Sequence, residues 1–226
     1  MGEISFHDAI ISCPIQEIEA ILVADPSLAT HEPGCDPPII WAAGNHRPDV
    51  VDLLIKHGAD IEVTDDDGKT ALHAAASECP EVVSVLLNHG AKLDVLDRLG
   101  CSPLVWAIWM QRSPEGEEAA KLLHGAGATV DLMAAAALGD LVEVRNLINL
   151  DPSGVQRVRS PEILLALAVS VCTYGTTMDR VQIVRLLLAN GLKLDMTQLL
   201  NVAATCETSG LTEYASVLRG FVDDKK

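Results

Sequence analysis

The sequence predicts an all-α solenoid of about seven helix–turn–helix units with short β-hairpin loops. The first observation is a fixed period. Gly58 and Gly90 are 32 residues apart, and Pro38, Thr70 and Ser102 open successive helices at the same interval. The second is that apolar pairs close the units, at positions 21–22, 53–54, 86–87, 122–123, 147–148, 186–187 and 217–218. The third is composition, because 49% of the residues are apolar and only 3% are aromatic. Such a chain suits thin helical layers that bury their apolar faces against their neighbours.

The units differ in how regular they are along the chain. We expect a single repeat domain over residues 1–226, made of an N-terminal capping unit at 1–36, regular repeats at 37–130, and divergent repeats with a C-terminal cap at 131–226. In the capping unit, Ile15, Ile18 and Ile21 recur at helical spacing, and glutamates fall on the opposite, solvent-facing side.

Helix boundary signals are clearest in the second and third units. Pro37-Pro38 begins a helix, where the missing N–H of proline is tolerated. Thr70 is a good N-cap for the following helix. Gly58 and Gly90 each follow a second helix and fit a left-handed C-terminal cap.

The later units depart from the period. The pair Leu122-Leu123 comes 36 residues after Leu86-Leu87 instead of 32, so a four-residue insertion lies near 111–116, between the helices of unit four. Unit five has lost its loop, because Asp131 is followed almost at once by a run of alanines. Unit six regains a loop at 151–159.

A family resemblance rests on specific residues. Thr70-Ala71-Leu72-His73 with the following alanines, and His-Gly-Ala at 57–59 and 89–91, resemble the ankyrin repeat. The resemblance is strong over about residues 38–130 and weaker on both sides. It implies that Thr70 caps a helix and that His73 hydrogen-bonds back toward it, which makes His73 a structural residue.

The resemblance also implies where a partner would bind. In this family, ligands are held by loop tips and by the exposed side of each unit's first helix. Carried over position by position, this gives a partner-binding set of Asn45, His46, Asp66, Asp67, Lys69, Glu78, Arg98, Leu99, Trp106, Trp109 and Met110.

Two tryptophans stand out in this set. Trp106 and Trp109 are three residues apart, and are therefore neighbours on one helix. Tryptophan is enriched among the residues that dominate binding energy, so an exposed pair favours a protein-binding patch. Two alternatives are that the insertion at 111–116 folds over the rings, or that both rings pack on unit three. Trp41 takes the register of His73, and we expect it in the core.

Charge is unevenly distributed. Residues 1–130 carry 7 Lys and Arg against 21 Asp and Glu, a net −14, whereas residues 131–226 carry 9 against 11, a net −2. An acidic half argues against binding to nucleic-acid phosphates. It favours a basic partner, or serves only solubility.

These observations predict a non-catalytic protein–protein interaction module, an adaptor or scaffold that binds a basic partner through its concave face. The alternative is a dedicated inhibitor or antidote that blocks one basic target, such as a toxin or nuclease. We expect no enzyme activity, cofactor or metal, and a monomer in the absence of its partner. An enzyme with an unrecognised site is a third hypothesis, but no phosphate-binding loop or nucleophile motif supports it.

Three weaker site hypotheses are set aside. His31 and Cys35 have no further recognisable ligand for zinc. The run Asp65-Asp66-Asp67 lacks the spacing of a calcium loop. Arg157 and Arg159 form a basic loop that could meet a partner, but we favour salt bridges within the protein.

Cysteine usage and hydropathy bear on location. The six cysteines include no C-x-x-C pair, and no signal peptide is visible. We therefore expect a reduced, cytoplasmic setting. No apolar run approaches the roughly 18 residues of a membrane span, so no membrane association is expected.

Overall fold

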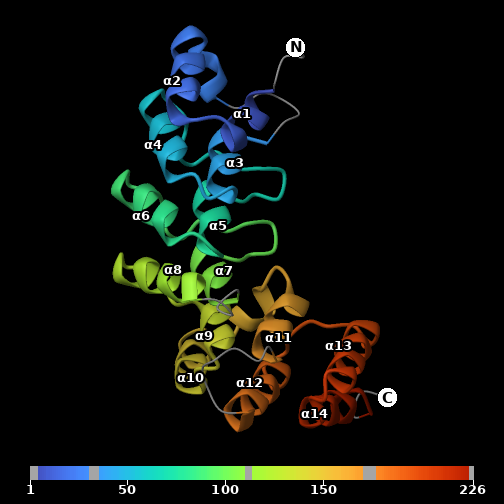
Figure 1. Cartoon of the computed structure of the whole chain (residues 1–226). Coiled ribbons are helices and arrows are strands. Elements are labelled where there is room, and N and C mark those ends of the chain that lie inside the picture. Colours follow the sequence, from blue (N-terminus) through green and yellow to red (C-terminus); the bar gives the residue numbers. More distant parts are fainter. Residues whose placement is uncertain (1–4, 31–35, 110–113, 170–176, 224–226) are drawn as a thin grey trace. The chain divides into compact units, whose positions relative to one another are not determined.

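The computed structural model describes residues 5–30, 36–109, 114–169 and 177–223. Over these ranges the chain forms fourteen α-helices and two 3-10 helices, and none of these residues is in a strand. The α-helices form seven consecutive pairs, which confirms the all-α repeat architecture predicted from the period (Figure 1). The pairs, which we call repeats from here on, belong to two larger compact units. Unit 1 comprises residues 1–129 and unit 2 comprises residues 130–226. The expectation of a single domain stays a prediction.

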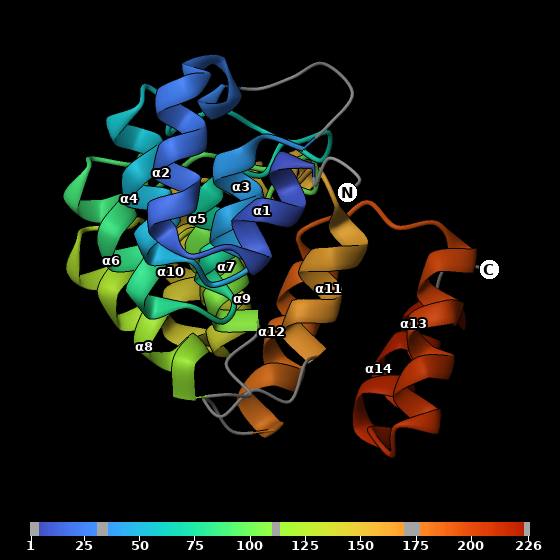
Figure 2. The same ribbon diagram turned by 45° about the horizontal axis from the view of Figure 1, so that its top comes forward.

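Unit 1 contains four helix pairs in two layers. Its elements are α1 (Phe6–Ser12), α2 (Ile15–Ala24), the 3-10 helix η1 (Pro26–Ala29), α3 (Pro38–Gly44), α4 (Pro48–Lys56), α5 (Ala71–Ala76), α6 (Pro80–Asn88), α7 (Pro103–Trp109) and α8 (Pro114–Gly125). The first helices α1, α3, α5 and α7 lie together on one side, and the second helices α2, α4, α6 and α8 on the other (Figure 2).

Small residues allow the first helices to pack closely. Ala43, Ala75 and Ala107 occupy equivalent places in three successive first helices, and all three are 0% exposed. Leucines complete the core from the second helices, with Leu54 and Leu86 also fully buried. Close packing at this density leaves little tolerance for larger side chains at the alanine positions.

Glycines end the second helices as predicted. Gly58 has φ +92° and Gly90 has φ +80°, the left-handed region that glycine enters without steric penalty. Beyond each glycine, the N–H of the next residue donates to a carbonyl five residues back, from Ala59 to Leu54 and from Ala91 to Leu86, both at 3.0 Å. These bonds satisfy carbonyls at the helix end.

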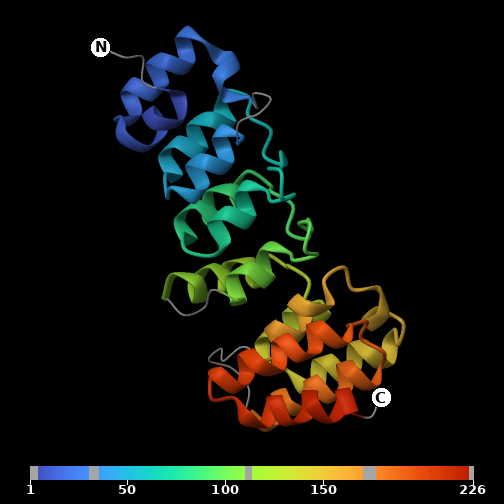
Figure 3. The same ribbon diagram turned by 90° about the vertical axis from the view of Figure 1, so that its right-hand side faces the viewer.

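In unit 1, hairpin-shaped loops connect α4 to α5 and α6 to α7 (Figure 3). In the loop between α4 and α5, the N–H of Asp65 donates to the carbonyl of Lys69 at 3.0 Å, and the loop between α6 and α7 repeats this bond from Asp97 to Cys101. The N–H of Arg98 donates to the carbonyl of Asp67 at 2.8 Å, which joins the two loop tips. The predicted hairpins are therefore turns closed by backbone hydrogen bonds.

Acidic side chains also join consecutive loops. The Glu62 carboxylate accepts the N–H of Lys92 at 2.8 Å. At the equivalent place in the next repeat, the Asp94 carboxylate accepts the N–H of Thr129 at 3.1 Å and its hydroxyl at 3.2 Å. Part of the negative charge of unit 1 thus has a structural use.

Unit 2 contains the remaining three pairs, in α9 (Leu132–Leu138), α10 (Leu141–Leu150), α11 (Pro161–Val169), α12 (Thr177–Ala189), α13 (Met196–Thr208) and α14 (Thr212–Asp223), with the 3-10 helix η2 (Gly154–Arg157). The Asp131 carboxylate caps α9 by accepting the N–H of Ala134 at 2.8 Å. Asp195 and Gln198 form a reciprocal capping box at α13. None of the helices within the described ranges has the length and hydropathy required to cross a membrane.

A buried arginine organises the centre of unit 2. Arg180 on α12 is 3% exposed. Its Nη2 donates to the carbonyl of Ala137 at 3.0 Å, and its Nη1 to those of Leu167 and Ala168 at 3.4 and 3.5 Å. These carbonyls lie in the last turns of α9 and α11, where the helix dipole favours a cation. A Cβ at Gly139 would lie 2.9 Å from the guanidinium carbon, so this position requires glycine.

Candidate functional site

The first helices of three consecutive repeats, together with residues of the adjoining loops, border an open hollow of about 460 Å³ in unit 1. It is lined by Asp36, Ile40, Trp41, Gly44, Asn45, Asp65, Lys69, His73, Ala74, Ser77 and Trp106. We call it the indole hollow, because tryptophans from α3 and α7 line it together with the small Ala74 of α5. Three consecutive repeats contribute to the site.

The Trp106 ring is held from several sides. Its indole N–H donates to Oδ2 of Asp97 at 2.8 Å, and Oδ1 of the same carboxylate accepts the N–H of Cys101 at 2.9 Å. Asp97 is only 1% exposed, so this bond is made away from water. The Trp109 ring lies 5.5 Å from the Trp106 ring, between centroids, at an interplanar angle of 33°. The Lys69 ammonium lies over the Trp106 ring, 4.2 Å from its centroid. Trp106 is therefore pre-positioned.

Trp41 is not the core residue expected from its register. It is half-buried and lines the indole hollow. Its indole N–H donates to the carbonyl of His7 at 3.2 Å, and the His7 ring meets it edge-on at 5.6 Å. The register argument failed because α1 supplies only one side of the cover over Trp41, which leaves another part of the ring facing the hollow.

His73 has the structural role that the resemblance implied. Its Nδ1 accepts the N–H of Thr70 at 3.0 Å, and its Nε2–H donates to the carbonyl of Cys101 at 3.2 Å. Burial lowers the pKa of His73 below its ordinary value, although the bond to Cys101 and the charge of Asp97 oppose this. The imidazole therefore joins two repeats as a neutral group.

The predicted partner-binding residues fall into three groups. Asn45, Lys69 and Trp106 line the indole hollow, and Trp109 adjoins it through Trp106. His46 and Glu78 lie just beyond α3 and α5, with the imidazole Nε2 3.7 Å from the carboxylate. The loop tips hold the exposed Asp66, Asp67 and Arg98 and the half-buried Leu99. Met110 lies outside the described residues.

The alternatives for the tryptophans are partly resolved. Both Trp106 and Trp109 are half-buried. The alternative that both rings pack on the third repeat is met for one ring, since Lys69 of that repeat lies over the Trp106 ring. Residues 111–113 of the insertion are outside the described ranges, and Pro114 already belongs to α8.

Sequence reasoning missed part of the hollow, namely Asp36, Ile40, Trp41, Gly44, Asp65, His73 and Ala74. A signal was present for some of them. Superposing the repeats places Trp41 at the position of His73, and Trp106 at the position of Ala74. Two large rings beside one small residue predict a depression on the middle repeat.

The weaker hypotheses have separate outcomes. Oδ1 of Asp65 accepts the N–H groups of Asp67 and Lys69, which gives the acidic run a turn-forming role. Arg157 pairs with Asp151, which confirms the internal pairing expected for that arginine. Across the described residues, no cluster of three or more His, Cys, Asp or Glu side chains could hold a metal ion. Residues 31–35, which include the considered zinc ligands, are not described.

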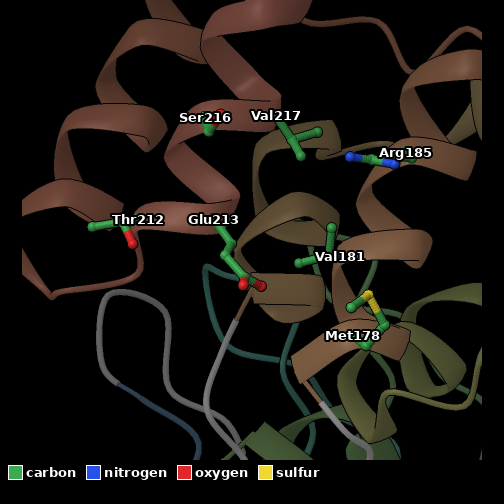
Figure 4. Close-up of a pocket in the computed structure, with 7 residues that line it drawn as sticks. All are labelled: Met178, Val181, Arg185, Thr212, Glu213, Ser216 and Val217. Carbon is green, nitrogen blue, oxygen red and sulfur yellow. The ribbon is translucent and has the colours of Figure 1, made fainter.

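A second hollow of about 410 Å³ lies in unit 2, between α12 and α14 (Figure 4). It is lined by Met178, Val181, Arg185, Thr212, Glu213, Ser216 and Val217. It contains no tryptophan and none of the residues predicted to bind a partner. Its arginine and glutamate balance each other in charge. The indole hollow is therefore the stronger candidate site.

Comparison with models of known protein families identifies the repeats. A family model of ankyrin repeats, in three copies, matches residues 39–134, which run from α3 into α9. No curated protein matches the chain. Ankyrin repeat proteins are typically non-catalytic and generally mediate protein–protein interaction. Residues 39–134 of this chain are therefore ankyrin repeats.

Proposed function

We propose that this protein is a non-catalytic adaptor or scaffold that binds a basic partner protein through the face formed by α3, α5, α7 and their loops. The observation that carries the proposal is the indole hollow, where Trp41 and Trp106 line one depression within the ankyrin repeats. Tryptophan is enriched among the residues that dominate binding energy, and such residues cluster in pockets at interfaces.

Pre-organisation supports this proposal. The N–H of each indole is already bonded within the protein, Trp41 to His7 and Trp106 to Asp97. The loop tips are joined by the bond from Arg98 to Asp67. Little conformational entropy is therefore lost on this side when a partner binds.

Charge favours a basic partner. Residues 1–130 have a net charge of −14, and the exposed Asp66, Asp67 and Glu78 lie on or beside the proposed face. Complementary charge raises association rates and selects against acidic proteins. The same charge fits an inhibitor of one basic target. A dedicated inhibitor binds one protein very tightly and blocks its activity, whereas an adaptor binds several proteins with moderate affinity.

The test is capture of partners by the wild-type chain and by Trp109→Ala, identified by mass spectrometry and followed by affinity measurement. We expect Trp109→Ala to weaken binding by about 2 kcal/mol while the melting temperature changes little. The matched control is Leu150→Ala, which truncates an apolar side chain that is 84% exposed on α10 of unit 2. Binding unchanged by Trp109→Ala, or a collapse of stability without loss of affinity, contradicts the proposal.

A further inference from the structure

We propose that the indole hollow binds an arginine side chain of the partner, with its guanidinium against the Trp41 ring and facing the carboxylates of Asp36 and Asp65. This inference rests on the proposed function and names the chemistry that the site selects. Trp41, Asp36 and Asp65 all line the hollow.

The lining offers aromatic surface more than indole donors. The indole N–H groups of Trp41 and Trp106 already donate to His7 and Asp97. What remains for a ligand is ring surface, whose negative π-face attracts cations. A partner group that needs a hydrogen-bond donor finds no free indole N–H here, whereas a cation can bind to the ring surface.

The protein itself already places a cation in the hollow. The Lys69 ammonium lies 4.2 Å from the centroid of the Trp106 ring. Within the described part of the chain it forms no ion pair with a carboxylate, although Asp65 lines the same hollow. This contact shows that the aromatic lining is accessible to a positive group.

The balance of charge in the lining favours a second cation over an anion. The lining contains two aspartates, Asp36 and Asp65, and one lysine, Lys69, while burial lowers the pKa of His73 and favours its neutral form. In the Asp65 carboxylate, Oδ1 accepts two backbone N–H groups, whereas Oδ2 accepts no hydrogen bond from the described residues. Across residues 1–130, 21 acidic residues stand against 7 basic ones. An incoming anion would meet this field with Lys69 alone in its favour.

Arginine fits these features better than lysine. A guanidinium is planar, so it can stack on an indole while its edge donates to a carboxylate. It is also less strongly hydrated than an ammonium, which lowers the penalty for entering a partly buried site. Lysine offers a point charge without the stacking surface.

The experiment uses the indole N–H resonances of the ¹⁵N-labelled full chain. All three tryptophans, Trp41, Trp106 and Trp109, are in unit 1, so the three resonances report on this region. The probe is the blocked tripeptide acetyl-Gly-Arg-Gly-amide, titrated beside the versions with lysine, citrulline and glutamate. Citrulline has the shape of arginine without its charge. We expect saturable shifts of Trp41 and Trp106 with arginine, binding about fivefold weaker with citrulline, and no saturable shift with glutamate.

Variants of the indole hollow test which of its residues bind the arginine peptide. Lys69→Met removes the resident cation, so we expect it to strengthen arginine binding about threefold to fivefold. Lys92→Met, which removes a lysine outside the hollow, is the control and should change affinity less than about twofold. Trp41→Leu should weaken binding about tenfold or more, and Trp41→Phe, which keeps an aromatic face, should weaken it less.

Two results would overturn the inference. One is saturable binding of the glutamate peptide together with weaker binding in Lys69→Met, which would make the hollow an anion site. The other is the absence of saturable binding by the arginine peptide. If Trp41→Leu does not fold, the citrulline peptide and Lys69→Met still decide. Either failure leaves partner capture and its dependence on Trp109 intact, so the proposed function is tested independently.

Discussion

In unit 1, consecutive helix pairs are hydrogen-bonded to each other through their loops, whereas in unit 2 a single buried arginine serves the ends of two helices. The bonds from Lys92 to Glu62 and from Thr129 to Asp94 are similar modest contributions repeated along the chain. Arg180 instead gathers carbonyls of α9 and α11 around one guanidinium. The comparison shows that a repeat protein can distribute its polar contacts or concentrate them. We expect the two arrangements to differ in their tolerance of single substitutions.

The largest expected effect comes from removing the buried arginine of unit 2. Arg180→Met leaves buried carbonyls of α9 and α11 without their donor, and we expect a loss of about 3 kcal/mol in the free energy of unfolding. Urea unfolding followed by far-UV circular dichroism measures it. Arg185→Met, an exposed arginine on the same helix, is the control and should change stability by less than about 0.5 kcal/mol. Equal effects from the two variants would remove the contrast between the units.

A second substitution tests the repeated helix ends of unit 1. Gly90→Val places a β-branched residue at φ +80°, so we expect a loss of about 2 kcal/mol. Gly125→Val is the matched control, because a Cβ at either glycine would have no heavy atom within 4 Å and only Gly90 has positive φ. A melting temperature unchanged in Gly90→Val would exclude a role for the left-handed cap.

The pH dependence of unit 1 tests the bond between repeats made by His73. Burial lowers the folded pKa of His73, so the unfolded chain binds more protons once the pH falls below about 6.5. Stability is therefore full above that pH and decreases below it, by at most about 1.4 kcal/mol at pH 5.5. Tryptophan fluorescence in urea reports unit 1, and His73→Gln should lack this part of the pH dependence. The same pH dependence in wild type and variant would assign it elsewhere.

The smallest effect concerns one loop-to-loop hydrogen bond. Glu62→Ala removes the acceptor of the Lys92 N–H in a partly solvated place, and we expect a loss of about 0.5–1 kcal/mol. Asp66→Ala, at an exposed loop tip, is the control and should be nearly neutral. A loss above about 2 kcal/mol would mean that unit 1 also depends on single contacts.

Much of the fold could be predicted because it depends on local rules. The 32-residue period, the left-handed glycines and the apolar closing pairs determine the seven helix pairs. Each signal lies within a few residues of the structure it specifies, as for Gly90 after α6. The loops also carried a local signal, since the run from Asp65 to Lys69 is a turn-forming sequence.

The candidate site was less predictable because it depends on contacts between repeats. Trp41 had the register of a core residue, and only the limited cover from His7 and α1 explains why it lines the hollow. The bond from Trp106 to the buried Asp97 joins a helix to the preceding loop tip. Arg180 likewise gave no local sign that it would be buried, because its acceptors come from α9 and α11.

The side-chain bonds between loops also have a kinetic consequence. The amides of Lys92 and Thr129 are protected by carboxylates of the preceding repeat, Glu62 and Asp94, so their exchange with deuterium depends on local opening of those junctions. The exchange rate of each amide thus reports how often one junction between consecutive repeats opens. Their separate exchange rates would reveal from which end the solenoid frays.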